Sequence, residues 1–336
     1  MNIRERLEEQ EYEHLSPLAS FSRNSKGRRK AETECDIRTV YQRDRDRILH
    51  SKAFRRLEDK TQVFLSPKGD HYRNRLTHTL EVSQTSRTVA KALQLNEDLV
   101  EAIALGHDLG HTPFGHAGER ALNSVADHGF EHCMQSLRVV DVLEKNGKGL
   151  NLTWEVRDGI VNHRISGRPA TLEGQIVRIC DKITYMHHDM DDARRAGILT
   201  ESDIPITLRM LLGDSMRERL NTLIHDLVQS SLGQERISMS EEMSAGMQQL
   251  RDIMFQSVYQ NPVAKKEENK AVDMILALYE YYMKHPEAMS EESVDAAHML
   301  GVPVQTAVLD YLSGMTDSYA MYKFKETFMP RSWAVF

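Results

Sequence analysis

The sequence is poor in cysteine and has no long apolar run. Only three cysteines occur among its 336 residues, at Cys35, Cys133 and Cys180, and no two of them form a CxxC pair. This usage excludes a disulfide framework and a zinc ribbon, and it is typical of a reducing cytoplasm. No stretch of about 18 apolar residues is available to span a membrane, and the charged beginning MNIRERLEEQEYEHL lacks the apolar segment of a signal peptide. We therefore expect a cytoplasmic protein without a membrane span.

A phosphate-binding P-loop is also absent, because the chain contains no GxxxxGK[ST] motif. The net charge of −7 gives no sign of nucleic-acid binding by the chain as a whole. The charge is uneven, however, because residues 21–60 carry thirteen Lys or Arg against seven Asp or Glu. This segment is either a solvated basic arm or lies near an anionic ligand.

Helical spacing of apolar residues dominates the sequence, and alternating strand patterns are scarce. Helices are predicted over residues 76–95, 96–110, 172–197, 214–229, 241–259, 271–285 and 308–328. The first of them should turn its apolar side chains inward, namely Leu76, Leu80, Val82, Val89, Ala90 and Leu93. The second should be capped by Asn96 and end at Gly110. One β-hairpin is predicted over residues 61–72, around a Pro-Lys-Gly-Asp turn.

Histidines are concentrated in one part of the chain, since seven of the fifteen lie between His71 and His132. The stretch HDLGHTPFGHAGE, residues 107–119, places three histidines, an aspartate and a glutamate beside three glycines and a proline. It is either a polar loop that is rich in histidine or a metal site with an acid/base pair beside it.

The adjacent His107 and Asp108 are the first candidates for metal ligands. Neighbours on a helix point about 100° apart, but both can reach one ion at a helix end, which Gly110 supplies. An HD dipeptide alone is a weak signal. It gains weight from His78 on the preceding predicted helix and from Asp181 on a later one. Taken singly, His78 could be a histidine that is hydrogen-bonded at a helix start, and Asp181 could be an aspartate that faces solvent. Two imidazoles and two carboxylates suit Mn²⁺, Fe²⁺, Mg²⁺ or Zn²⁺ better than a thiolate site would.

An acid/base pair is predicted at His116 and Glu119, which are three residues apart and can therefore meet on one helix face. A carboxylate bonded to an imidazole fixes its tautomer and raises its basicity. His111 and His132 could complete a ring of donors around this pair.

Six motifs resemble those of a known family in their order and spacing, namely HSKAFRRLEDKTQVF, RNRLTHTLEV, HDLGHTPFGHAGE, FEHCMQSLR, DKITYMHHD and DYLSGMTDSYA. The family is that of the deoxynucleoside triphosphate triphosphohydrolases, within the HD phosphohydrolase superfamily. The resemblance covers about residues 25–325. It implies an all-α fold, an HD-domain helical core with a small β-hairpin and an additional C-terminal helical lobe. The expected division is an N-terminal arm over 1–45, a catalytic core over 46–200 and a C-terminal helical region over 201–336.

The resemblance also implies roles for individual residues. The metal ligands would be His78, His107, Asp108 and Asp181, holding Mn²⁺ or Mg²⁺, with Fe²⁺, Zn²⁺ or Ni²⁺ as alternatives. His116 resembles the catalytic histidine and Glu119 its orienting carboxylate, while His111 and His132 resemble phosphate-contacting histidines. The substrate contacts would be Arg75 at the α-phosphate, Lys182 at the triphosphate tail, Gln62 and Asp189 at the sugar 3′-hydroxyl, and Tyr185 under the sugar ring.

The expected reaction is attack by a metal-activated water on the α-phosphorus of a dNTP, giving deoxynucleoside and intact triphosphate. The expected partners are the dNTP substrate, a dNTP that acts as allosteric effector, and further copies of the chain in a dimer-based oligomer or hexamer. Two other functions stay open at this point. One is a different HD activity, such as a nucleotide monophosphatase or a cyclic-nucleotide phosphodiesterase. The other is a dNTP-sensing or nucleic-acid-binding protein with a vestigial site.

Overall fold

The computed structural model describes residues 1–62, 73–260 and 262–330. Within these ranges the chain is helical and contains no β-strand, only isolated bridges between Arg28 and Thr153 and between Thr61 and Asn74. The predicted all-α class is thus confirmed. The predicted hairpin falls, except for Thr61 and Gln62, on residues outside those described. No helix in the described part of the chain is long and apolar enough to cross a membrane.

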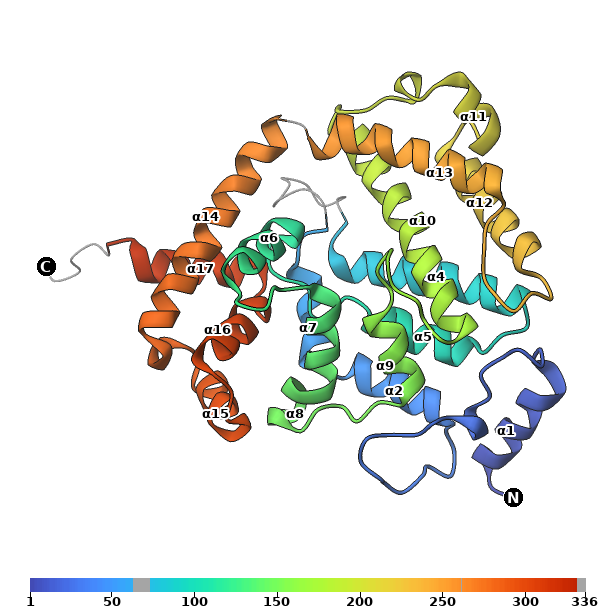
Figure 1. Ribbon diagram of the computed structural model, residues 1–336, viewed down its shortest axis with the longest axis horizontal. Coiled ribbons are helices and arrows are strands. Elements are labelled where there is room, and N and C mark those ends of the chain that lie inside the picture. The colour runs from blue at the N-terminus through green and yellow to red at the C-terminus, as the bar shows by residue number, and fades with distance from the viewer. Residues whose placement is uncertain (63–72, 261, 331–336) are drawn as a thin grey trace, which may run out of the picture.

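Seventeen α-helices follow one another in the described residues (Figure 1). They are α1 (Ile3–His14), α2 (Val40–Leu49), α3 (Lys52–Arg56), α4 (Arg75–Ala92), α5 (Glu97–Gly106), α6 (Gly115–Val125), α7 (His132–Arg138), α8 (Glu144–Gly147), α9 (Trp154–Val161), α10 (Leu172–Arg195), α11 (Ile206–Leu212), α12 (Met216–Ser231), α13 (Glu241–Met254), α14 (Pro262–Lys284), α15 (Glu291–Leu300), α16 (Val304–Ser313) and α17 (Asp317–Phe328). Short 3₁₀ or π segments lie at Ser22–Asn24, Leu57–Asp59, Val139–Leu143, Glu201–Asp203, Phe255–Tyr259 and Pro286–Ala288.

Helix α5 lies at the centre of the core. Its N-terminus is capped as expected, because the side chain of Asn96 accepts a hydrogen bond from the backbone N–H of Leu99 at 3.2 Å. Seven of its residues are buried, from Leu99 to Gly106 with the exception of Glu101. A helix that is apolar on nearly every side must be surrounded by other elements, and α2, α4, α9 and α10 all pack against it.

Two expectations about these helices are wrong. Helix α5 ends at Gly106 rather than at Gly110, because Ser136 of α7 accepts a hydrogen bond from the N–H of Gly110 and donates one to the carbonyl of His107. On α4, Leu80 is 48% exposed. The buried stripe of that helix instead includes small polar residues such as Thr79 and Ser83, and Leu80 lies outside it.

The buried hydrophobic side chains of the described residues form two clusters. The larger one surrounds α5 and continues through α10 into α11, α12 and α13. The smaller one joins α6 to α14, α16 and α17, so α6 packs against the C-terminal helices although it follows α5 in the chain (Figure 1). Residues 107–114, called the histidine loop below, connect α5 with α6. The loop therefore runs from one hydrophobic cluster to the other.

The histidine loop packs tightly against α7. A Cβ atom added at Gly110 would lie 2.1 Å from the backbone nitrogen of Ser136 and 2.3 Å from the carbonyl carbon of Gln135. Real Cβ atoms do not approach backbone atoms so closely, so a side chain here would force the loop and α7 apart. Only glycine allows this contact.

We expect Gly110→Ala to lower the free energy of unfolding by about 1–3 kcal/mol, because overpacking a close contact costs this much. Urea denaturation followed by circular dichroism measures the change. Gly233→Ala is the control, since a Cβ there meets no atom within 4 Å and only its φ of +70° is unfavourable. Gly110→Ala should also weaken metal binding, whereas Gly233→Ala should not. Wild-type stability and metal binding in Gly110→Ala would refute the tight packing.

Candidate metal centre and active site

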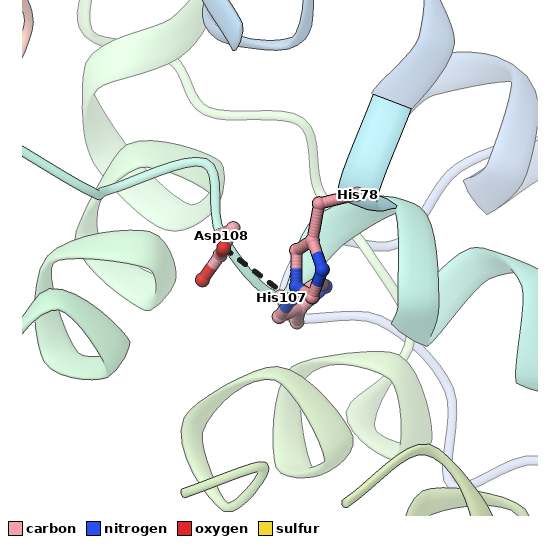
Figure 2. A group of neighbouring side chains, drawn as sticks. All are labelled: His78, His107 and Asp108. Atoms are coloured by element: carbon pink, nitrogen blue, oxygen red, sulfur yellow. Dashed lines mark ion pairs between the residues drawn. The ribbon is translucent and has the colours of Figure 1, made fainter. Parts of the chain in front are cut away.

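Three of the predicted ligands meet where α4 approaches the end of α5. His78 projects from α4, and His107 and Asp108 directly follow α5, as Figure 2 shows. One ligand atom from each of these three buried side chains lies within 4.8 Å of the other two. The fourth predicted ligand, Asp181 of α10, places Oδ1 3.1 Å from Nε2 of His78 and 3.7 Å from Nε2 of His107. The structure therefore brings all four together.

The hydrogen bonding of His107 shows which ring nitrogen faces this group. Its Nδ1 donates to the carbonyl oxygen of Ala104 at 2.6 Å, so Nε2 is the ring nitrogen that points toward the other ligands. That Nε2 is buried and has no hydrogen-bond partner among the described residues. It lies 3.5 Å from Oδ2 of Asp108. An imidazole nitrogen and carboxylate oxygens that face one another are the ligand types that bind a divalent metal ion, so these residues fit such an ion.

Both aspartates are ionised in this setting. Burial alone would raise the pKa of Asp108, but His107 and Arg75 outweigh it and hold the pKa well below its usual value. Burial likewise opposes ionisation of Asp181, yet the hydrogen bond from His78 and the neighbouring imidazoles lower its pKa. Ionised carboxylates are the form that binds a metal ion.

Behind His78 lies a pair that the sequence analysis did not identify. Nδ1 of His78 is 3.4 Å from Nδ1 of His188 on α10, and Nε2 of His188 pairs with the carboxylate of Glu81. Such outer partners orient the ligand ring. A signal for His188 was present in the sequence, because it follows Asp181 by seven residues and so lies on the same face of the helix two turns later.

A second cluster forms around Glu119 of α6. Its Oε1 lies 2.8 Å from Nδ1 of His132 and accepts the backbone N–H of the same residue at 2.7 Å. Its Oε2 lies 3.3 Å from Nδ1 of His116, so the predicted His116–Glu119 contact is present. Burial would raise the pKa of Glu119, but its bonds to His116 and His132 lower it well below the usual value. His111 stacks on His132 with ring centroids 4.6 Å apart, and the side chain of His116 is 72% exposed.

His163 links the two clusters, and the sequence analysis did not identify it. Its Nε2 lies 3.1 Å from Nε2 of His132 and 4.0 Å from Oδ1 of Asp108, while its Nδ1 donates to the carbonyl of Ile160. Burial lowers the pKa of His163 to about 4, so the ring is neutral near pH 7. No local pattern marks this residue, since it follows His132 by 31 positions and lies outside the histidine-rich part of the chain.

Arg75 connects the metal group with the segment that precedes α4. One of its nitrogens, Nη1, pairs with Oδ2 of Asp108, and the other, Nη2, donates to the carbonyl of Thr61 at 3.2 Å. Next to Thr61, Oε1 of Gln62 is buried and has no hydrogen-bond partner among the described residues. These two predicted substrate contacts thus lie close to the candidate metal centre.

The other three predicted substrate contacts lie on α10, at Lys182, Tyr185 and Asp189. Burial and the charges of Arg251 and Arg178 lower the pKa of Lys182. Burial raises the pKa of Tyr185 to about 12, and Arg251 hydrogen-bonds its hydroxyl group. Arg251 belongs to α13, so only the packing of α13 on α10 reveals this basic group, which comprises Arg178, Lys182 and Arg251.

The basic segment 21–60 is mostly used for ion pairs within the fold. Arg28 pairs with buried Asp44, and Arg45 pairs with Asp98 at 3.2 Å. Arg73, two residues before α4, likewise pairs with Asp191 at 2.8 Å. These arginines therefore neutralise carboxylates of the protein itself.

Lys60 is different, because it contacts the histidine loop. Its buried Nζ donates to the carbonyl of His111 and, at 2.8 Å, to the carbonyl of Ser313. Asp317, the first residue of α17, accepts the N–H of Phe114 through Oδ1 at 2.8 Å and the N–H of Thr61 through Oδ2 at 3.0 Å. The C-terminal helices thus hold the second half of the histidine loop, at Phe114 directly and at His111 through Lys60.

Two family models match the chain, the HD domain at residues 75–186 and the phosphohydrolase-associated domain at residues 237–326. A phosphohydrolase of known structure from Bacteroides thetaiotaomicron has a similar fold, with a TM-score of 0.53 and 17% sequence identity over 84% of this chain and 68% of that one. The fold and the His/Asp cluster define a phosphohydrolase of the HD class.

Full-length relatives narrow this class. A deoxyguanosinetriphosphate triphosphohydrolase-like protein of Caldanaerobacter subterraneus is 55% identical over 333 residues, which is 99% of this chain and 98% of the relative. A protein of the same description from Desulfatibacillum aliphaticivorans is 47% identical over 98% of this chain and 99% of its own length. The chain belongs to this family of deoxyguanosinetriphosphate triphosphohydrolase-like proteins.

We expect His107→Ala to lower the affinity for Mn²⁺ by at least about a hundredfold, because losing even an outer hydrogen-bond partner of a ligand typically costs 10–100-fold. Isothermal titration of Mn²⁺ into the protein measures this directly, without reference to activity. His225→Ala serves as control, since His225 is exposed on α12 and bonds the carbonyl of Asn221 on its own helix. A folded His107→Ala protein with wild-type affinity would show that the ion binds elsewhere.

Proposed function

We propose that the protein hydrolyses deoxynucleoside triphosphates to deoxynucleoside and inorganic triphosphate in the cytoplasm, and so lowers dNTP pools. The observation that carries the proposal is the buried His/Asp group, in which Nε2 of His107 faces two ionised carboxylates. It is continuous, through His163 and His132, with a histidine–glutamate pair that can transfer protons. The full-length relatives carry the corresponding description.

A divalent ion, Mn²⁺ or Mg²⁺, would be held by His78, His107, Asp108 and Asp181; when bound, it supplies Lewis-acid chemistry to a water molecule and to the phosphoryl oxygen. Arg75 already contacts Asp108, so its guanidinium group is placed to bind the α-phosphate next to the ligands. Its position at the buried end of α4 also keeps the planar group fixed before substrate arrives.

The proton for the departing 5′-oxygen comes from His116. Its side chain is exposed and therefore accessible to a substrate, while Glu119 bonds Nδ1 and leaves Nε2 to face the reacting group. Because Glu119 also holds His132, a single carboxylate fixes both rings. Buried His111, whose Nδ1 has no hydrogen-bond partner among the described residues, and His132 contact the phosphates.

Most of the remaining substrate contacts lie on α10. Lys182, together with Arg178 and Arg251, attracts the anionic triphosphate tail. Tyr185 lies one turn after Asp181, so its ring packs against the sugar and leaves no room for a 2′-hydroxyl. Gln62 and Asp189 bind the 3′-hydroxyl. We further propose that the chain forms a homo-oligomer and that a dNTP acts as effector as well as substrate.

We expect each dNTP, alone or in pairs with another, to yield tripolyphosphate and deoxynucleoside in the presence of Mn²⁺ or Mg²⁺. Ion-exchange and reversed-phase chromatography resolve these products. GTP should be hydrolysed at least about tenfold less efficiently than dGTP, because the 2′-hydroxyl would be buried without a partner.

Other products would contradict the proposal. Release of inorganic phosphate from monophosphates, or opening of cyclic nucleotides, would indicate a different HD activity. Tight dNTP binding with no turnover at saturating metal would indicate a sensor. Equal hydrolysis of GTP and dGTP would refute only the role of Tyr185 in excluding the 2′-hydroxyl, and not the proposed reaction.

We expect His116→Ala to lower kcat by about 10²–10⁴-fold while metal and dNTP still bind, since this is the usual contribution of a general acid. Glu119→Gln should lose less, because it orients the ring without donating a proton to substrate. His128→Ala is the matched control, an exposed histidine in the same part of the chain. A His116→Ala enzyme within tenfold of wild type would exclude this residue as the acid.

A further inference from the structure

A cavity of about 440 Å³ lies between α3, α8, α15 and α16, apart from the candidate metal centre. None of the predicted metal ligands, and none of the histidines of the second cluster, lines it. Pockets for small molecules typically measure about 300–1,000 Å³. The cavity is therefore large enough for a small ligand, and neither the family models nor the proposed reaction gives it one.

The carboxylates around this cavity already have partners. Glu144 accepts the backbone N–H groups of Lys52 and Ala53 at the start of α3, at 3.2 and 2.7 Å. The carboxylate of Asp310 accepts two hydrogen bonds from the guanidinium group of Arg138, at 2.7 and 2.6 Å. On the rim, Glu292 pairs with Lys52.

Two basic side chains in the cavity wall, buried Lys60 and half-buried Arg56, have no such partner among the described residues. Nη1 of Arg56 donates to the carbonyl of Gly314 at 2.6 Å, and Lys60 donates to the carbonyls of His111 and Ser313. Among the described residues neither cation forms an ion pair with a carboxylate, and carbonyl oxygens do not neutralise a positive charge. Burial lowers the pKa of Arg56, and it lowers the pKa of Lys60 to about 7. Charges that lie inside a protein are normally paired, so the two side chains make this cavity suitable for an anionic ligand.

Much of the remaining wall is apolar. Leu300, Val302 and Ala307 line it together with the rings of Tyr311 and Tyr319. A ligand that matches both parts has an anionic head and an apolar or aromatic body. The planar guanidinium group of Arg56 favours a phosphate head, which it can bind through two parallel hydrogen bonds.

The rim of the cavity is also under backbone strain. Lys145 and Asn146 of α8 both line it, and both have positive φ, at +53° and +54°. Non-glycine residues adopt this conformation rarely, although asparagine does so more often than most, and strained residues cluster at functional sites. Lys145 adds a further cation to the residues that line the cavity.

We propose that this cavity binds a small organic phosphate, with the phosphate on Arg56 and Lys60 and the apolar body against α15 and α16. Such a ligand would also affect the histidine loop, since Lys60 donates to the carbonyl of His111. The site is thus linked to the candidate active site through one buried side chain.

The test is a calorimetric titration of phenylphosphonate, whose P–C bond resists hydrolysis, into the full-length, Mg²⁺-loaded protein. We expect Arg56→Gln to weaken binding by at least about tenfold, because it removes a charge-assisted hydrogen bond from a buried phosphate. Arg55→Gln is the matched control on the same helix, since Arg55 is exposed and does not line the cavity. Its affinity should stay within twofold of wild type.

Arg56 also donates a hydrogen bond to Gly314, so Arg56→Gln could lose binding through misfolding. A second variant that keeps Arg56 tests this explanation. Ala296 lines the cavity from α15, so Ala296→Phe should fill the space and abolish binding while Arg56 stays in place. Phenol, which has the ring without the phosphate, should not bind detectably. The proposal is overturned if wild type does not bind phenylphosphonate, or if Arg56→Gln and Ala296→Phe both bind it as wild type does. The latter result would show that the phosphonate binds outside this cavity.

Discussion

Two ionised carboxylates held inside a helical core impose the main constraint on this protein. Asp108 and Asp181 come from different helical regions, and burial disfavours the charge of each. The surrounding imidazoles and Arg75 offset this cost, and a metal ion would complete the compensation. The packing of α4 and α10 against α5 brings His78, His107 and Arg75 within reach of both carboxylates. The contacts that stabilise the two buried carboxylates are therefore the same contacts that form the candidate metal centre.

The C-terminal helices take part in the construction of the site. Lys60 bonds both the histidine loop and the end of α16, and Asp317 of α17 bonds Phe114 within that loop. Phe114 has a φ of +61°, an uncommon conformation for a large side chain. Contacts from outside the HD segment hold it there. The phosphohydrolase-associated region, residues 237–326, is thus structurally coupled to the HD domain that it follows. The division of the chain at residues 45 and 200 stays a prediction, but the packing of α6 against α14 shows that the two regions share a hydrophobic cluster.

Local sequence patterns predicted helix positions well where side chains of the helix itself determine its bounds. The cap at Asn96 and the extent of α10 follow from side chains a few residues apart, and both are confirmed. The position of Leu80 was wrong, because burial depends on which neighbours cover a helix and not on side-chain type alone. The end of α5 was misplaced for a similar reason, since Ser136 of another helix determines it.

By itself, the sequence determined the all-α class, the family and the residue types that meet at the candidate metal centre, because these depend on composition, periodicity and the spacing of motifs. Only the tertiary structure decided that His163 joins the two histidine clusters and that Arg251 lies beside Tyr185. It also decided that most arginines of the basic segment pair with internal carboxylates, whereas Arg56 and Lys60 form no ion pair within the described part of the chain. The physical reason is that ionisation and charge pairing depend on burial and on partners distant in the chain, and folding alone brings those together.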